Sequence, residues 1–261
     1  MKIVVCLKQV PDTNEVKIDP KTGTLIRDGV PSIINPDDKN AIEGALALKD
    51  IYGGTVTLVT MGPPQAKVAL EEGLAMGADE ALLITDRAFA GADTLATSYA
   101  LASAIKSLDY DIIFAGRQAI DGDTAQVGPE IAEHLGMPQI TYVEAVSEEK
   151  PGVLNVRRAW EDGYENIRVN TPVLLTAIET LNVPRYMSIK NIFSMAKEKE
   201  VKVWTVADME VDLNKLGLKG SPTKVKKSMT KEAKGQGEIF NVSPKEAASV
   251  ALAKLKEKHL I

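Results

Sequence analysis

A polar, glycine-rich stretch directly follows an apolar run near the middle of the chain. It reads "FAGRQAIDGDTAQVGPE" from Phe114 to Glu130. Its glycines, at positions 116, 122 and 128, permit backbone amides to approach a ligand closely. Its second half, "DTAQVGPE", is typical of the start of a helix, where unpaired amides favour anions. The stretch therefore predicts a phosphate site, with Arg117 as a source of positive charge.

Two acidic residues of the same stretch, Asp121 and Asp123, would repel a phosphate group. They could instead cap the helix, or accept a hydrogen bond from a ribose hydroxyl or a neighbouring amide. An acidic surface turn without a ligand fits the spacing equally well. Neither a GxGxxG pattern nor a P-loop follows any of the predicted strands, which disfavours an ordinary dinucleotide site.

Short apolar runs alternate with longer amphipathic segments over the first two-thirds of the chain. The apolar runs occupy residues 2–7, 54–62, 80–85 and 111–116, and the amphipathic segments occupy residues 37–51, 63–77 and 93–108. Continuous apolar runs are typical of parallel strands covered on both faces. The sequence thus predicts an α/β fold with a Rossmann-like, doubly wound, mostly parallel sheet. Ligands bind beyond the carboxyl ends of such strands, where four loops would meet: residues 6–13, 34–38, 60–65 and 114–130.

Composition narrows the classes of partner. The chain has 261 residues, 44% of them hydrophobic, and its 31 basic and 36 acidic residues are well mixed, with a net charge of -5. No uniformly basic surface is available for nucleic acid. The sequence shows no secretory segment and no apolar run of membrane length, so we expect a cytoplasmic protein with no membrane partner. Cys6, His134 and His259 are too few and too scattered to predict a disulfide or a metal site.

The composition changes after residue 203. Residues 204–261 are rich in Lys, Gly, Ser and Pro, with few apolar residues before a terminal helix that Ser243 caps. This predicts a nucleotide-binding domain at residues 1–203 and an extended arm at residues 204–261, which would need a surface to lie on. A free lysine-rich tail is the alternative.

Three segments resemble the beta (small) subunit of electron-transfer flavoproteins, and the likeness runs over the whole chain. They are "MKIVVCLKQVPDT" at the N-terminus, "GRQAIDGDTAQVGP" within the central stretch, and "VRRAWEDGYENIRVNTPVLLT" from Val156 to Thr176. The last fits the family signature at Arg158, Glu161, Asp162, Gly163, Glu165, Ile167, Pro172 and Thr176. The same residues also predict a β-hairpin followed by a buried strand, so the signature could serve packing more than chemistry.

The resemblance implies a fold related to adenine-nucleotide hydrolases and an adenine nucleotide in the four loops. Cys6, Leu7 and Lys8 would line the adenine, Asn35 would face the ribose or base, and Met61 would close one side. The phosphates would be held by Gly116, Arg117, Gln118, Asp121, Gly122, Asp123, Thr124, Gln126, Val127 and Gly128. No side chain is expected to act as a catalytic acid or nucleophile, and Cys6 would contact the ligand without redox chemistry.

A segment at residues 182–198 resembles the family's partner-recognition loop. It would dock a flavin-dependent dehydrogenase, such as an acyl-CoA dehydrogenase, through Arg185, Tyr186, Ile189, Lys190, Phe193 and Lys197. Ile189 stands where the family has a leucine. The alternative is an amphipathic helix packed on its own domain. The arm would wrap the alpha subunit.

The resemblance does not decide whether the nucleotide is FAD or AMP. Residues 86–97, "DRAFAGADTLAT", resemble members that hold a second FAD and bifurcate electrons from NADH, which makes Phe89, Ala90, Gly91, Asp93, Thr94 and Thr97 candidates for an NADH site. A plain N-capped helix is the competing interpretation. In the first case electrons would pass from NADH to the beta FAD, through the alpha-subunit FAD to a dehydrogenase, and to ferredoxin or flavodoxin. The alternatives are a scaffold subunit with AMP and a stand-alone adenine-nucleotide-binding stress-type protein.

Overall fold

The structure is a computed structural model that describes residues 1–12, 17–18, 25–26, 31–224 and 237–261; of residues 17–18, 25–26 and 195–198 it describes the backbone alone. Thr13, at the end of the first predicted loop, and the side chain of Lys197 lie outside the described residues. The chain divides into two compact units, Met1–Lys227 and Ser228–Ile261.

The first unit is built on a nine-stranded sheet in the order β11-β10-β9-β12-β8-β1-β6-β7-β13. Its strands are β1 (Lys2–Cys6), β6 (Thr55–Met61), β7 (Glu80–Ile84), β8 (Ile112–Gly116), β9 (Gln139–Lys150), β10 (Val153–Trp160), β11 (Gly163–Asn170), β12 (Val173–Ala177) and β13 (Val201–Trp204). Seven strands pair in parallel, and only β10 and β11 are antiparallel to their neighbours. The predicted mostly parallel α/β sheet is confirmed.

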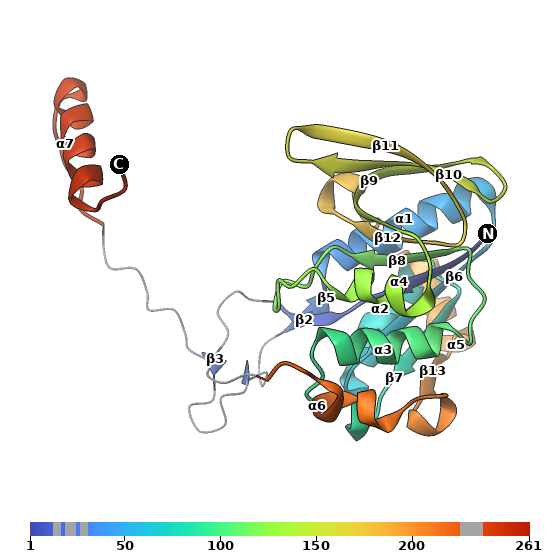
Figure 1. Cartoon of the computed structure of the whole chain (residues 1–261). Helices are drawn as coiled ribbons and strands as arrows, with labels where there is room; N and C mark the ends of the chain where they lie inside the picture. Colours follow the sequence, from blue (N-terminus) through green and yellow to red (C-terminus); the bar gives the residue numbers. More distant parts are fainter. Residues whose placement is uncertain (13–16, 19–24, 27–30, 225–236) are drawn as a thin grey trace. The chain divides into compact units, whose positions relative to one another are not determined.

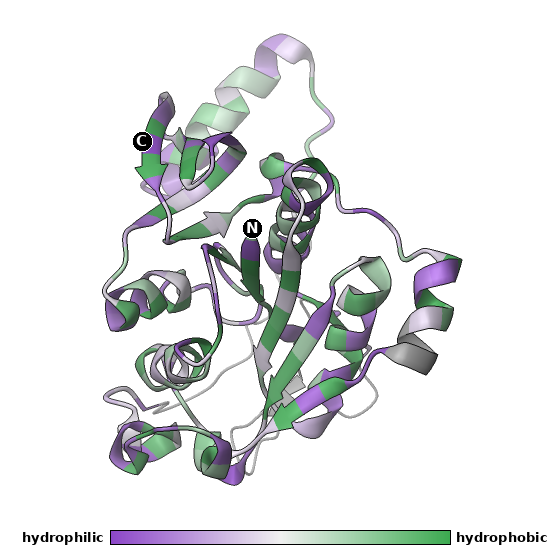
Figure 2. Cartoon of the chain, turned by 90° about the vertical axis from the view of Figure 1, so that its right-hand side faces the viewer, coloured by the Kyte–Doolittle hydropathy of each residue, from purple (hydrophilic) through white to green (hydrophobic). Residues whose placement is uncertain are grey.

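Helices cover both faces of this sheet (Figure 1). The helices of the first unit are α1 (Pro36–Tyr52), α2 (Lys67–Met76), α3 (Thr94–Ile105), α4 (Val127–Leu135), α5 (Ile189–Glu198) and α6 (Gly217–Gly220), and the second unit contains α7 (Pro244–Glu257). One hydrophobic core lies between the sheet and α1 and α2, and a second lies between the sheet and α3 and α4. Strand β1 supplies Ile3 and Val5 to the first core and Val4 and Cys6 to the second. Because alternate side chains of a strand point to opposite faces, a strand between two cores is apolar throughout, and Figure 2 shows hydrophobic runs along the inner strands.

Shorter elements complete the description. They are the strands β2 (Gln9–Pro11), β3 (Lys17–Ile18), β4 (Leu25–Ile26) and β5 (Ser32–Ile34), and the 3-10 turns η1 (Pro64–Ala66), η2 (Arg87–Phe89), η3 (Glu179–Leu181), η4 (Val206–Asp208) and η5 (Leu213–Lys215). Strand β2 pairs with β5, and β3 pairs with β4.

The signature segment forms a β-hairpin and then the buried strand β12. Strands β10 and β11 pair from Val153↔Asn170 to Trp160↔Gly163, so Glu161 and Asp162 alone form the turn. All five residues of β12 are buried. The hairpin predicted from the same residues is therefore present.

The first compact unit extends beyond the boundary expected at residue 203. Leu216, Gly217 and Ser221 are buried, and Leu216 belongs to the core beneath α3. A few buried residues in a polar stretch are enough to hold it on the domain. In the second unit none of residues 237–261 is buried, and α7 begins with a capping box of Ser243 and Glu246. Among the described residues no helix is both long and apolar enough to cross a bilayer.

Candidate functional site

The strand order reverses at β1, between its neighbours β6 and β8. At such a switch point the loops that follow two adjacent strands, here β1 and β8, diverge to opposite sides of the sheet. Ligands of open α/β sheets bind in the crevice between such loops. The residues that follow β1 and β8 here are Leu7 and Lys8 on one side and the stretch from Gly116 onward on the other. Both belong to the predicted loops.

Asp38, at the start of α1, joins the two sides of this crevice. Its Oδ2 accepts from the backbone amide of Lys8 (2.8 Å) and its Oδ1 from that of Gly116 (2.9 Å). Burial raises the pKa of this carboxyl to about 7, although the two amide hydrogen bonds act in the opposite direction. The sequence interpretation did not single out Asp38. The only sign of its role in the sequence was its position beside Asp37 in the predicted loop at residues 34–38.

Asn35 holds the central stretch against α1. Its Nδ2 donates to the carbonyl of Gln118 (2.8 Å), its Oδ1 accepts from the amide of Ile120 (3.0 Å), and its own amide donates to the Lys8 carbonyl (2.9 Å). The side chain is buried, and its amide group donates one of these bonds and accepts another. The structure therefore gives Asn35 an organising role at the crevice.

The two aspartates of the central stretch bond to neighbouring side chains. Asp121 Oδ1 lies 2.5 Å from Lys8 Nζ, and Asp123 Oδ1 accepts from Gln118 Nε2 (2.9 Å). Neither caps α4, whose N-cap residue is Gln126 with no side-chain cap. The capping option for these aspartates is therefore wrong, because residues 124–126 separate Asp123 from the first residue of the helix.

The segment before α4 presents consecutive backbone amides. The amides of residues 124–128 donate no hydrogen bond within the part of the chain that the structure describes. Asp123 and Ala125 have φ values of 50° and 54°, in the left-handed region that non-glycine residues rarely occupy. Such strain concentrates at functional sites. Consecutive free amides at a helix N-terminus bind anions well.

The three glycines of the stretch have different roles. A Cβ at Gly116 would lie 2.3 Å from Asp38 Oδ1, and one at Gly128 would lie 2.8 Å from Thr176 Cγ2, whereas one at Gly122 would meet nothing within 4 Å. Gly116 and Gly128 are thus required by packing inside the protein. Only Gly122 leaves open space beside the backbone.

Arg117 supplies the second positive charge of the crevice besides Lys8. Its Nε lies 3.4 Å from Asp37 Oδ2, and its guanidinium lies 5.9 Å from the ring centroid of Tyr142. Both the Nε and the Oδ2 are buried without a hydrogen-bond partner among the described residues. Burial raises the pKa of Asp37, and Arg117 acts against this shift. The Arg117 side chain is 35% exposed, so a ligand could meet its terminal nitrogens but not its buried Nε.

The residues expected around an adenine lie at the strand ends. Cys6 and Leu7 are buried, and burial raises the pKa of the Cys6 thiol to about 12. Met61 is half-buried at the end of β6. Cys6 packs in the core beside α3 and α4, so its backbone is better placed than its thiol to meet a ligand. Among the described residues no group of acidic, His and Cys side chains could hold a metal.

Residues 216–223 contact three of the candidates for an NADH site, Ala90, Gly91 and Asp93, of which Ala90 and Gly91 remain exposed. Phe89 is buried, Ala90 accepts from the Leu218 amide (3.0 Å), and a Cβ at Gly91 would approach Leu218. Asp93 caps α3 by accepting from Ala96, but its second oxygen accepts from the amide (3.0 Å) and hydroxyl (2.8 Å) of Thr223.

Further along, Thr97 is half-buried on α3, and its amide donates to the Asp93 carbonyl. Thr94 alone reaches the central stretch, where its hydroxyl donates to Gln126 Oε1 (3.0 Å). The long-range bonds from Ser221 and Thr223 had no signal in the sequence. Thr94 remains the candidate closest to the crevice.

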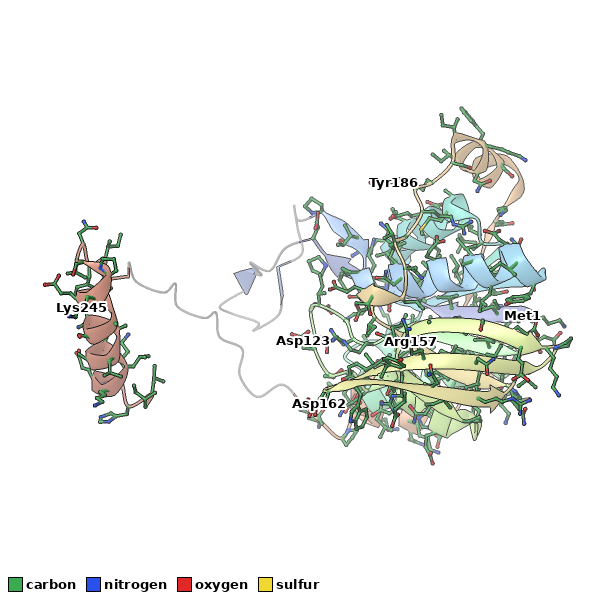
Figure 3. The ribbon with its side chains drawn as sticks, turned by 90° about the horizontal axis from the view of Figure 1, so that it is seen from above. Met1, Asp123, Arg157, Asp162, Tyr186 and Lys245 are labelled. Carbon is green, nitrogen blue, oxygen red and sulfur yellow. The ribbon has the colours of Figure 1, made fainter. Side chains whose placement is uncertain are left out.

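The predicted docking residues lie around the start of α5. Tyr186, Ile189, Lys190 and Phe193 are exposed. Arg185 differs from them, because its guanidinium bonds to Glu43 and Asp50 of α1 within the chain. Figure 3 shows Tyr186 on the segment that leads into α5, apart from Asp123 of the central stretch and Arg157 of the hairpin.

The fold defines an α/β protein of the open-sheet class, in which ligands bind at the switch point of the strand order. A family model described as "Electron transfer flavoprotein domain" matches residues 22–209. The "Electron transfer flavoprotein subunit beta" of Clostridium acetobutylicum is 70% identical over the whole of both chains. "Caffeyl-CoA reductase-Etf complex subunit CarD" of Acetobacterium woodii is 56% identical, and "Acryloyl-CoA reductase electron transfer subunit gamma" of Anaerotignum propionicum is 48% identical, each over the whole of both chains.

The chain belongs to the electron transfer flavoprotein family and corresponds to its beta subunit. Its function is therefore in electron transfer together with an alpha subunit, and the family associates it with a flavin or AMP. The stand-alone stress-type alternative is set aside.

Proposed function

We propose that this beta subunit binds FAD in the switch-point crevice, receives electrons from NADH, and passes them through the alpha-subunit FAD to a dehydrogenase and to ferredoxin or flavodoxin. The observation that carries the proposal is the row of backbone amides at residues 124–128, which have no hydrogen-bond partner among the described residues. Arg117, in the same stretch of the chain, adds a positive charge. In this role the residues of the crevice would bind and orient the flavin, which would supply the hydride and single-electron chemistry.

The residues of the crevice fit a dinucleotide with a pyrophosphate. Lys8 offsets the charge of Asp121, whereas Asp123 is bonded to the neutral Gln118 and keeps its charge. The backbone amides supply the donors for phosphate oxygens. Gly122 leaves room for the ligand next to the backbone. Asn35 and Asp38 hold the two loops together through hydrogen bonds.

FAD is favoured over AMP by the position of α3. The bond from Thr94 to Gln126 brings the N-terminus of α3 next to the phosphate stretch, so a ligand longer than AMP would meet a second helix N-terminus. Two relatives carry names of reductase complexes, for caffeyl-CoA and for acryloyl-CoA. These names support a dehydrogenase of acyl-CoA type as the partner. AMP in a scaffold subunit is the second candidate.

The remaining parts of the chain would serve assembly. The segment 237–261 has exposed apolar side chains at Ile239, Phe240, Val242, Leu252 and Leu255, and we assign it to the alpha subunit as the arm. The exposed residues Tyr186, Ile189 and Phe193 would dock the dehydrogenase, because exposed apolar clusters of this kind mark protein interfaces.

Arg117→Gln, with Arg157→Gln as its control, tests the proposal. Arg157 also pairs with a carboxylate, Glu144 (2.8 Å), and lies 5.1 Å from the ring centroid of a tyrosine, but it is on the hairpin. In anaerobic complexes with the alpha subunit, we expect NADH to bleach the flavin absorbance of the wild type and of Arg157→Gln. Arg117→Gln should bind the beta flavin at least about tenfold more weakly and lose this reaction. A wild-type complex that dithionite bleaches and NADH does not would contradict the proposal.

A further inference from the structure

A short segment of the first unit is unusually exposed for its composition. We call residues 183–193 the docking segment. Val183, Tyr186, Ile189 and Phe193 are exposed by 89%, 96%, 75% and 64%. A segment with so few buried apolar contacts would ordinarily be mobile. Its conformation must therefore be fixed by other means if it is to meet a partner in one arrangement.

Polar bonds to α1 hold the beginning of this segment. Asn182, just before it, exchanges two hydrogen bonds with Asn40: Asn40 Nδ2 donates to the Asn182 carbonyl (2.8 Å), and Asn182 Nδ2 donates to the Asn40 carbonyl (3.0 Å). Asn40 is buried. The chain is thus fixed to α1 at the point where the exposed residues begin.

The strongest attachment is between Arg185 and Glu43. Glu43 Oε2 accepts from the backbone amide (3.0 Å) and the Nε (2.8 Å) of Arg185, and its Oε1 accepts from the Nη2 (2.9 Å). The same Nη2 donates to Asp50 Oδ2 (2.8 Å). These bonds raise the pKa of Arg185, with the hydrogen bond to Glu43 as the largest cause. A buried carboxylate that holds both the backbone and the side chain of one residue fixes its conformation.

These contacts are part of a larger pattern on α1. Half of the buried polar residues that the structure describes, Asn35, Asp38, Asn40 and Glu43, lie within nine positions of one another. The first two bond to the loops of the crevice, and the last two bond to residues 182–185. Buried polar groups that bond outside their own helix specify how neighbouring segments are arranged.

We infer that the Glu43–Arg185 pair positions the docking segment from within the chain, so that Arg185 is a positioning residue and makes no contact with the partner. This inference rests on the proposed function, which assigns the segment to the dehydrogenase. It replaces the expectation that Arg185 itself docks the dehydrogenase. Tyr186 and Ile189 would then contact the dehydrogenase, and Arg185 would hold them in position.

The test uses the complete complex with the alpha subunit and compares Arg185→Gln, Glu43→Gln and the double variant. Arg168→Gln is the matched control, because Arg168 also makes a bidentate pair with a glutamate, Glu149, but on the hairpin. Two quantities are measured: the hydrogen exchange of residues 182–193, which needs no partner, and the concentration of an acyl-CoA dehydrogenase that gives half the maximal rate of electron transfer. Flavin content monitors folding.

We expect each single variant to raise both quantities about tenfold, with the maximal rate and the flavin content changed less than about twofold. The double variant should match the single variants, because both remove one interaction. Arg185→Lys should behave like Arg185→Gln, since lysine keeps the charge but not the two-pronged geometry. The control should match the wild type.

A direct contact between Arg185 and the partner predicts another pattern. Glu43→Gln would leave docking unchanged, Arg185→Lys would restore it, and hydrogen exchange would not rise; this result would overturn the inference. Faster exchange with unchanged half-saturation would instead overturn the docking role within the proposed function, so the two failures can be told apart.

Discussion

At the scale of single residues, Asp38 is a buried carboxyl whose proton affinity depends on folding. Its pKa rises from 3.8 to about 7, chiefly through burial. Between these two values the folded chain keeps a proton that the unfolded chain has lost. The retained proton stabilises the folded chain. This stabilisation has its full value below pH 3.8, declines as the pH rises from 3.8 to about 7, and is absent above about pH 7.

Asp38→Asn should remove this pH dependence. Urea unfolding of both chains at several pH values from 4.5 to 7.5 should show a slope that is less negative in the variant, by at most about 1.4 kcal/mol per pH unit. Loss of one acceptor for the amides of Lys8 and Gly116 shifts the whole curve without changing its slope. Parallel curves for the two chains would show that Asp38 is ionised throughout this range.

Gly128 illustrates a residue whose role the sequence suggested only in part. The sequence predicted close approach to a ligand, whereas the close approach in the structure is to Thr176 Cγ2. Gly128→Ala should lower the free energy of unfolding by about 1–3 kcal/mol through overpacking and displace the free amides of α4. The second change Thr176→Ser removes the methyl group and should restore most of the loss, as measured by urea midpoints. Gly122→Ala is the control, with an expected effect within about 0.5 kcal/mol; equal losses at both glycines would contradict this account.

At the scale of elements, the strands and the hairpin could be predicted because their signals are local. Apolar runs such as Lys2–Cys6 and the two-residue turn at Glu161 and Asp162 are visible in the order of residues alone. The contacts of Asp38 with Lys8 and Gly116, and of Arg185 with Glu43, join residues 30 to 142 positions apart. No periodicity encodes such pairs, so the roles of Asp38 and Arg185 became apparent only in the fold.

The segment after β13 also makes contacts with distant residues that the sequence alone did not reveal. Its polar composition predicted an arm from residue 204, but Leu216 is buried and Thr223 bonds to the cap of α3. A chain that ends at Lys224 should therefore keep the thermal midpoint of the full chain within a few degrees. A chain that ends at residue 203 should lose several kcal/mol of stability, because the second core loses Leu216 and Asp93 loses two donors. Thermal unfolding by circular dichroism compares the three chains, and equal midpoints for all of them would restore the boundary at residue 203.

At the scale of the whole molecule, the chain has the properties of one part of an assembly. Its first unit presents free amides and an exposed docking segment, and its second unit has no buried residue among those described. The second unit therefore needs a partner surface if it is to be held in one arrangement. What the assembly does with electrons then depends on the nucleotide that the crevice holds, since FAD can accept electrons and AMP cannot.

Counting the nucleotides in the purified alpha–beta complex tests this central claim most directly. Acid extraction followed by chromatography separates FAD from AMP and gives the amount of each per complex. We predict two FAD and no AMP per complex in the wild type, and one FAD in Arg117→Gln, because only the beta site depends on this residue. One FAD and one AMP per wild-type complex would contradict the account and identify the chain as a scaffold subunit.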